Sequence, residues 1–192
     1  MVCIRDERVC STATATYGGD AMTADATQLH TSAGTTQDLR VYVFRKTNAK
    51  GGARDIVVTL DAAATYWGFF GAAVSGLSHN LQPNITGGAD GEAAAGDPTV
   101  AITTTVANTI RFDAVYNKSG TSMTAGSSQT IIGQILVNGG SDRALGGYII
   151  YTTAGAKTST WTETADDEWA MASAAYVVLP INANQIDIGT NF

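Results

Sequence analysis

The sequence predicts an all-β protein, a single antiparallel β-sandwich that resembles a jelly roll, with about ten to twelve strands and very little helix. Three observations predict this fold class. Only 15% of the 192 residues are charged, while Gly, Ala, Thr and Ser are abundant. Short apolar segments recur with turn signals between them. No repeat of fixed period appears, which disfavours propellers and solenoids. We expect the sandwich over residues 1–179 and a C-terminal extension over residues 180–192.

The expected strands are short and rich in β-branched and aromatic residues. Two polar segments between them, 24–37 and 78–97, are expected to be surface loops. The expected strands cover residues 2–4, 9–16, 21–23, 39–45, 56–60, 66–77, 99–105, 110–116, 130–137, 148–151, 159–162 and 169–179. The fifth follows the fourth through a Gly-Gly turn, and the eleventh follows the tenth through Ala154-Gly155-Ala156, so each of these two pairs is expected to be adjacent and antiparallel.

The segment 66–77, YWGFFGAAVSGL, has the densest aromatic cluster of the chain. Bulky residues on both faces with glycines between them are typical of a central strand packed on each side. The segment 169–179 is also apolar on both faces and is expected to be buried on both. In 110–116, by contrast, Arg111 and Asp113 are expected to face solvent.

The first two expected strands are joined by a charged loop of hairpin length, Arg5 to Arg8. In that hairpin Cys3 faces Cys10, at a separation close to disulfide range. Two cysteines cannot define a disulfide framework by themselves, so a disulfide and two small buried thiols both remain open.

Several pieces of the sequence resemble, in the same order, a β-sandwich family of bacteriophage virion proteins and of surface or secreted proteins of environmental bacteria. The matching pieces are ATYGGDAMT, LRVYVFRK with DIVVTL, WGFFGAAVSGL, IRFDAVY and EWAMASAAYVVLP. The resemblance implies a jelly-roll-like sandwich that serves as a structural or attachment module without catalytic residues. Family members usually carry a strand or two before the position where this chain starts.

The extension 180–192 contains Ile186 and Ile188 in alternation. We expect it to pack on a neighbouring subunit as an added strand. The alternative is that it lies along its own domain.

The charge pattern argues against two classes of partner. A net charge of −6 and a pI near 4.7 leave no basic patch to follow a phosphate backbone, so nucleic acid is not expected as a partner. No apolar run approaches the roughly 18 to 20 residues that a membrane helix needs, so a membrane is not expected either. The charged N-terminal residues do not form a secretory signal.

Residues suited to chemistry are few and scattered. His30 and His79 lie in separate expected loops without metal-ligand spacing. Two acidic groups, Asp90/Glu92/Asp97 and Asp166/Asp167/Glu168, lack the pattern of a calcium loop. We therefore predict no metal, no cofactor and no catalytic residue.

Of the three tryptophans, Trp67 and Trp169 fall in the most apolar strands and are expected in the core. Trp161, on a Thr-rich strand, is the candidate for stacking on a sugar ring.

Taken together, the sequence predicts a non-enzymatic assembly protein located in a virus particle, as a capsid, decoration or tail component of a phage, and working as a homo-oligomer or with other virion proteins. The alternative is an extracellular or cell-surface module that binds carbohydrate or builds a filament by strand addition.

Overall fold

The computed structural model describes residues 1–6, 9–33, 36–49, 51–75, 77, 82–92, 96–164, 167–178 and 188–189. It is all-β, as expected, and every strand pairing among these residues is antiparallel. The described residues form seventeen strands, more than expected, because β4 and β9 lie in segments expected to be loops and because β3, β8, β12 and β17 are short strands of two residues each. One 3₁₀ turn, η1 (Asn138–Gly140), is the helical element of the described residues, and none of these residues form a helix long and apolar enough to cross a membrane.

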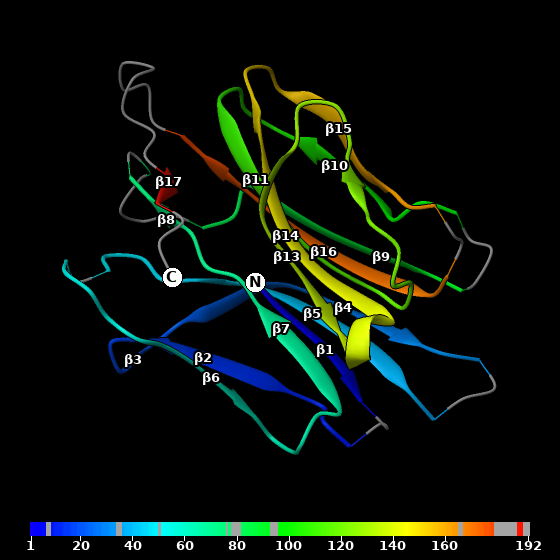
Figure 1. The fold of residues 1–192 in the computed structure, drawn as a ribbon. Coiled ribbons are helices and arrows are strands. Elements are labelled where there is room, and N and C mark those ends of the chain that lie inside the picture. The colour runs from blue at the N-terminus through cyan, green and yellow to red at the C-terminus, as the bar shows by residue number, and fades with distance from the viewer. Residues whose placement is uncertain are drawn as a thin grey trace.

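The strands form four stacked sheets (Figure 1), which we number I to IV. Sheet I consists of β3 (Asp20–Ala21), β2 (Ala13–Tyr17) and β6 (Ile56–Leu60), in that order across the sheet. Sheet II consists of β4 (Thr23–Thr31), β5 (Asp38–Arg45), β1 (Val2–Asp6) and β7 (Tyr66–Phe69). Sheet III consists of β13 (Thr130–Val137), β14 (Asp142–Tyr151), β11 (Thr109–Asn117), β16 (Trp169–Val177) and β9 (Ile85–Gly91). Sheet IV consists of β10 (Thr99–Thr104), β15 (Gly155–Thr162) and β12 (Thr124–Ala125). The short strands β8 (Ala73–Val74) and β17 (Ile188–Gly189) pair with each other outside these layers.

Three hydrophobic cores lie between the four sheets. The largest joins sheets II and III and includes Leu39, Val41, Phe112 and Tyr176. A second joins sheets III and IV around Trp161, and a third joins sheets I and II. Sheets II and III are therefore covered on both faces, which explains why several of their strands are apolar without alternation.

The position of β11 differs from the expectation. Arg111 and Asp113 were expected to face solvent, and both are completely buried, because sheet IV covers the face of sheet III from which they project. The expectation for β16 is confirmed, since it is buried on both faces nearly throughout. The alternation expected for residues 99–105 is also confirmed, because every second residue of β10 is buried.

The aromatic segment 66–77 is not central. Its first part is β7, the edge strand of sheet II, which pairs with β1 alone. Trp67 is 49% exposed and stacks on Phe69, with ring centroids 5.9 Å apart. The expectation was wrong because Trp67 and Phe69, at i and i+2, share one face of an edge strand, and that face is partly exposed.

Three expected strand pairings are also wrong. β1 pairs with β5 and β7 rather than with the strand that follows it. β5 and β6 lie in different sheets, as do β14 and β15. In each case the two strands exist, but the chain crosses to another layer between them.

The two cysteines are free and buried. Cys3 lies in the core between sheets II and III, and Cys10 lies in the core between sheets I and II. Since sheet II separates the two thiols, the alternative of a disulfide is wrong and that of two buried thiols is confirmed.

The C-terminal strand β17 pairs with β8 of its own chain, with Ile188 in register with Val74. This is the alternative given for the extension, whereas packing of the extension on a neighbouring subunit stays a prediction. Ile186 lies outside the described residues.

Candidate functional site

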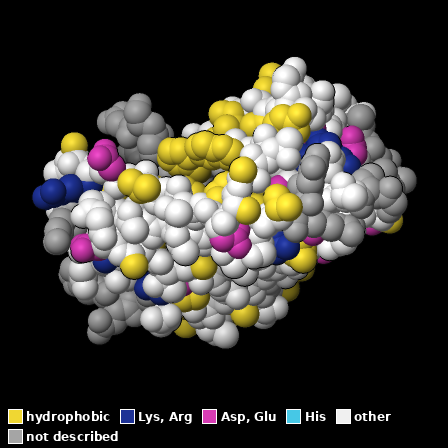
Figure 2. Space-filling view, turned by 90° about the horizontal axis from the view of Figure 1, so that it is seen from below, with side chains coloured by type: hydrophobic (Ala, Val, Ile, Leu, Met, Phe, Trp, Pro, Cys, Tyr) yellow, Lys and Arg dark blue, Asp and Glu magenta, His cyan; other side chains and the backbone are white. Residues whose placement is uncertain are grey.

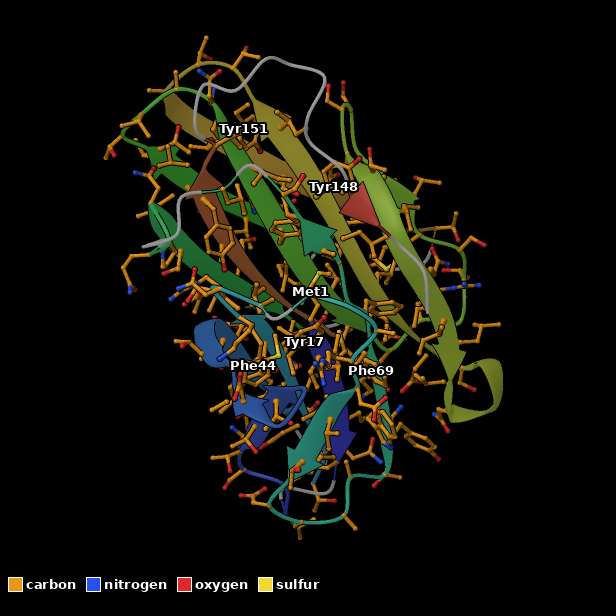
Figure 3. The ribbon with its side chains drawn as sticks, turned by 90° about the vertical axis from the view of Figure 1, so that its left-hand side faces the viewer. Met1, Tyr17, Phe44, Phe69, Tyr148 and Tyr151 are labelled. Carbon is orange, nitrogen blue, oxygen red and sulfur yellow. The ribbon has the colours of Figure 1, made fainter. Side chains whose placement is uncertain are left out.

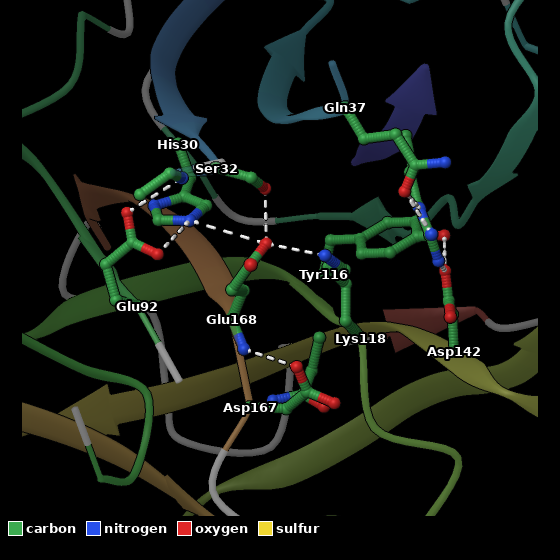
Figure 4. A network of polar contacts seen from close by, with 12 residues as sticks. His30, Ser32, Gln37, Glu92, Tyr116, Lys118, Asp142, Asp167 and Glu168 are labelled. Carbon is green, nitrogen blue, oxygen red and sulfur yellow. Dashed lines mark hydrogen bonds and ion pairs between the residues drawn. The ribbon is translucent and has the colours of Figure 1, made fainter. Parts of the chain in front are cut away.

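A cluster of polar side chains lies where the edge strands β4 and β9 of the two central sheets come together, beside the start of β16 (Figure 4). His30 lies on β4, Glu92 directly follows β9, and Glu168 directly precedes β16. One ligand atom from each of these three side chains lies within 4.8 Å of the other two. We call these three residues the His30 cluster.

The imidazole of His30 is 2% exposed. Its Nδ1 lies 2.9 Å from Asp90 Oδ2, and because a carboxylate only accepts, Nδ1 carries the proton of that hydrogen bond. Its Nε2 is buried and has no hydrogen-bond partner. Nε2 lies 3.9 Å from Glu92 Oε2 and 3.7 Å from Glu168 Oε2, too far for a hydrogen bond to either.

The two carboxylates are held by further contacts. The Ser32 hydroxyl and Lys118 Nζ, the latter at 2.7 Å, both donate to Glu168 Oε2. The backbone N–H of Ala33 donates to Glu92 Oε1 at 3.2 Å. Burial acts to raise the pKa of Glu168, but the hydrogen bonds from Lys118 and Ser32 outweigh it, so this pKa lies below its usual value. Glu168 is therefore ionised.

Strand register explains why these residues meet. The last pair of the β9–β16 ladder is Gly91 with Trp169, so the next residue on each strand is a glutamate, Glu92 or Glu168. The carboxylates of Glu92 and Glu168 therefore lie close together on neighbouring strands, and two like charges at such positions repel each other unless a cation lies between them. β4, in the facing sheet, adds His30.

All three members of the His30 cluster were candidates from the sequence, but in three separate segments. The segments around His30 and Glu92 were expected to be loops, whereas β4 and β9 are strands. In β4 the alternation of Ala26, Gln28 and His30 on the inward side was a signal that His30 is not solvated. Asp97 lies elsewhere and accepts a hydrogen bond from the Glu163 backbone N–H. His79 and Asp166 lie outside the described residues.

An apolar surface lies at the opposite edge of the two central sheets, where they end in β7 and β13. The two strands are adjacent across the layers, since a Cβ on Gly68 would lie 2.6 Å from Ile135 Cδ1. Neither strand contains a charged residue, and in the described residues no strand pairs with the outer side of either. The large apolar side chains exposed on them are Trp67, Phe69, Ile131, Ile135 and Leu136. We call this surface the β7/β13 edge.

Hydrophobic side chains gather around a hollowed part of the surface in Figure 2, whereas the charged side chains on that face are scattered. An open groove of about 570 Å³ lies next to β7. Its lining includes the exposed Trp67, and no polar side chain contributes to it: Val58, Leu60, Ala62, Ala63, Ala64 and Trp67. Such a lining suits an apolar side chain better than a sugar, which needs hydrogen-bonding groups to orient it.

The tryptophans occupy positions different from those expected. Trp161 is fully buried between sheets III and IV, so its expected role in stacking on a ligand is wrong. Trp169 is in the core, as expected, and its indole N–H donates to the Gly96 carbonyl at 2.9 Å. Trp67, expected in the core, is the exposed one. In the view of Figure 3, Phe69 lies below Met1 and Tyr148.

No family model, curated protein or solved structure matches this chain. The family resemblance described from the sequence therefore stays a prediction.

Proposed function

We propose that this protein is a non-enzymatic structural subunit that assembles with further copies of itself through the β7/β13 edge. The observation that carries the proposal is that both central sheets end, on the same side, in strands without charge and with exposed apolar side chains. Natural proteins usually protect such edges with lysine, proline or a covering element. A partly exposed aromatic pair beside an apolar groove is also typical of a contact surface between proteins.

Two routes of contact are open to a second copy at this edge. Its own edge strand can add to β13, which among the described strands pairs with β14 alone, or its side chains can fill the groove beside Trp67. Both routes bury apolar area that is exposed in the single chain. The largest core supports either one, because Ile132 and Val137 of β13 pack against it and hold the strand in place.

The setting that we propose for this assembly is a virus particle, and in particular a phage capsid, decoration or tail. This part of the proposal depends on the family resemblance of the sequence. Electron microscopy of the assembled protein would test it, because a closed shell or a tube of regular symmetry is expected for a particle component.

Self-association of the purified full chain tests the role of the edge. Leu136 lies on β13 and is 53% exposed, so Leu136→Lys places a charge in the proposed contact without disturbing a core. We expect this substitution to weaken the association constant by at least about tenfold, because an unpaired ammonium is costly to bury. Sedimentation velocity over a range of concentrations measures the constant.

The matched control is Val57→Lys on β6, where the side chain is 51% exposed and lies on an edge strand of sheet I. This variant should associate like the unmodified chain. The proposal fails if the unmodified chain stays monomeric at every concentration, or if the two lysine variants weaken association equally.

A further inference from the structure

We propose that His30, Glu92 and Glu168 bind a divalent transition-metal ion, with zinc as the ion that this ligand set fits best. The ion would lie among His30 Nε2 and one oxygen of each carboxylate, with water completing its coordination. This inference is independent of the proposed assembly.

The orientation of the His30 ring is the first argument. Since Nδ1–H is hydrogen-bonded to Asp90, the neutral ring has its lone pair on Nε2, the buried atom without a partner. Metal-bound histidines usually donate their other N–H to a carboxylate in this way, which fixes the tautomer and the ring plane. Gln28 Nε2 in turn donates to Asp90 Oδ1 at 2.6 Å, so the orienting carboxylate is itself held.

The spacing of the ligand atoms is the second argument. A tetrahedral zinc site with ligands about 2.0 to 2.2 Å from the metal separates neighbouring ligand atoms by about 3.4 Å. The distances of 3.7 and 3.9 Å from His30 Nε2 to the two glutamates are slightly wider. Small side-chain rotations would close them, and the half-exposed side chain of Glu92 has room for one while its other oxygen, Oε1, keeps the hydrogen bond from Ala33.

The charge of the site is the third argument. The carboxylates of Asp90, Glu92 and Glu168 surround the His30 ring. Among the described residues, Lys118 forms an ion pair with Glu168. With a neutral imidazole, three negative charges and one positive charge leave two negative charges. A divalent cation neutralises them.

The donor set selects among metals. An imidazole nitrogen with two carboxylate oxygens suits zinc, and also manganese or iron in the divalent state. Calcium and magnesium prefer sites built from oxygen alone, so the nitrogen at the centre of this cluster disfavours them.

Bound metal would connect the two central sheets. His30 belongs to sheet II, whereas Glu92 and Glu168 belong to the ends of neighbouring strands of sheet III. One ion would therefore pin the β4 edge of one sheet to the β9 edge of the other. Because the ligands come together only in the folded chain, binding should raise the unfolding temperature.

Calorimetric titration of the tag-free full chain with zinc chloride, after removal of metals with EDTA, tests the proposal. We expect saturable binding of one ion per chain and a rise in the unfolding temperature that grows with zinc concentration. Glu92→Gln removes a ligand from a half-exposed position and should weaken binding at least about tenfold, and Asp90→Asn, which affects only the orienting residue, should weaken it about 10- to 100-fold.

Asp55→Asn is the matched control, because it removes one exposed carboxylate away from the cluster and should leave zinc affinity unchanged. Circular dichroism establishes that each variant is folded. Nitrogen-15 NMR of the imidazoles identifies the ring involved, and zinc should shift the Nε2 resonance of His30.

Three results would overturn the proposal. The first is a folded, unmodified chain that binds none of zinc, manganese and cobalt saturably. The second is equal zinc affinity for Glu92→Gln and Asp55→Asn. The third is a titration in which only the ring of His79 responds.

Discussion

Arg111 and Asp113 are two completely buried charges on the face of β11 that meets sheet IV. Arg111 Nε donates to Asp113 Oδ1 at 2.7 Å, and the other Asp113 oxygen accepts from the Ser159 hydroxyl at 2.6 Å. Arg111 Nη2 donates to the Ser173 hydroxyl and to the Val100 carbonyl. A buried ion pair contributes little net stability, but removing one partner leaves an uncompensated charge. Through Val100 and Ser159 the pair links sheet III to sheet IV.

Asp113→Ala should lower the free energy of unfolding by about 3 to 5 kcal/mol, because it leaves the Arg111 guanidinium buried without its counter-charge. Denaturant unfolding measures the change. The double change Arg111→Met and Asp113→Leu should cost less than the single one, because it removes both charges. A loss of under about 1 kcal/mol for Asp113→Ala would contradict this account.

Burial of Cys3 predicts a loss of stability in alkali. Desolvation raises the pKa of this thiol to about 12, against 9.0 for an unperturbed thiol. Because the pKa is higher in the folded chain, the thiol of the unfolded chain loses its proton first as pH rises. The contribution of the buried thiol to the free energy of unfolding is therefore intact below pH 9 and is lost as pH rises from 9 to 12.

The free energy of unfolding should accordingly fall between pH 9 and 12 more steeply in the unmodified chain than in Cys3→Ala. The comparison isolates this thiol, because the buried tyrosines Tyr116 and Tyr176, whose pKa values burial also raises, are shared by both chains. Chemical denaturation at a series of pH values measures both slopes, and parallel slopes would refute the assignment.

The residues of the candidate site could be singled out from the sequence by their chemistry, but their positions in space could not. His30, Glu92 and Glu168 were each considered, yet they come from three segments far apart in the chain. Their meeting depends on strand register and on the stacking of two sheets, and neither is encoded in local spacing. The burial of Trp161 could not be predicted for the same reason. Its strand is rich in Thr, and such a strand is buried only where another sheet covers it.

The sequence predicted which segments form strands more reliably than it predicted which strands pair with each other. The segments of β5, β6, β10, β11, β13 and β16 were all expected as strands. Which of them are central was not predictable from the apolar pattern alone, because β7 has the strongest aromatic signal and lies at an edge. β11 carries two charges and is buried on both faces. A strand is central when other layers cover it, and that depends on the rest of the chain.

The contact between β14 and β15 gives a prediction at the scale of elements. Gly147 lies under the Trp161 ring, and a Cβ at this position would come within 2.6 Å of the ring and 2.9 Å of the Thr130 carbonyl oxygen. Gly147→Ala should therefore force sheets III and IV apart locally and cost about 2 kcal/mol of unfolding free energy.

Gly51→Ala is the matched control, because nothing lies within 4 Å of a Cβ built there and the backbone does not have a positive φ. This change should be neutral or slightly stabilising. Thermal unfolding compares the two variants. If Gly147→Ala proved as harmless as Gly51→Ala, the close packing of Trp161 on β14 would be wrong.

The whole molecule consists of four sheets rather than the two layers expected of a single sandwich, and each half of the sequence forms two of them. Residues 1–69 supply every strand of sheets I and II, and residues 85–177 supply every strand of sheets III and IV. Each half forms two sheets around a core of its own, and the largest core joins the halves. The fold class was predictable from composition and turn spacing. The number of layers was not predictable, because the strands of two further sheets have the same composition and length as those of a two-layer sandwich.

The division of the chain between the sheets has a consequence for synthesis. A ribosome delivers the first half before the second, so the nascent chain can close sheets I and II while Leu39, Val41 and Val43 still face water. That uncovered face persists until the later strands emerge. Translation speed through the second half, or a chaperone that shields the first, then determines how much of the newly made polypeptide escapes aggregation.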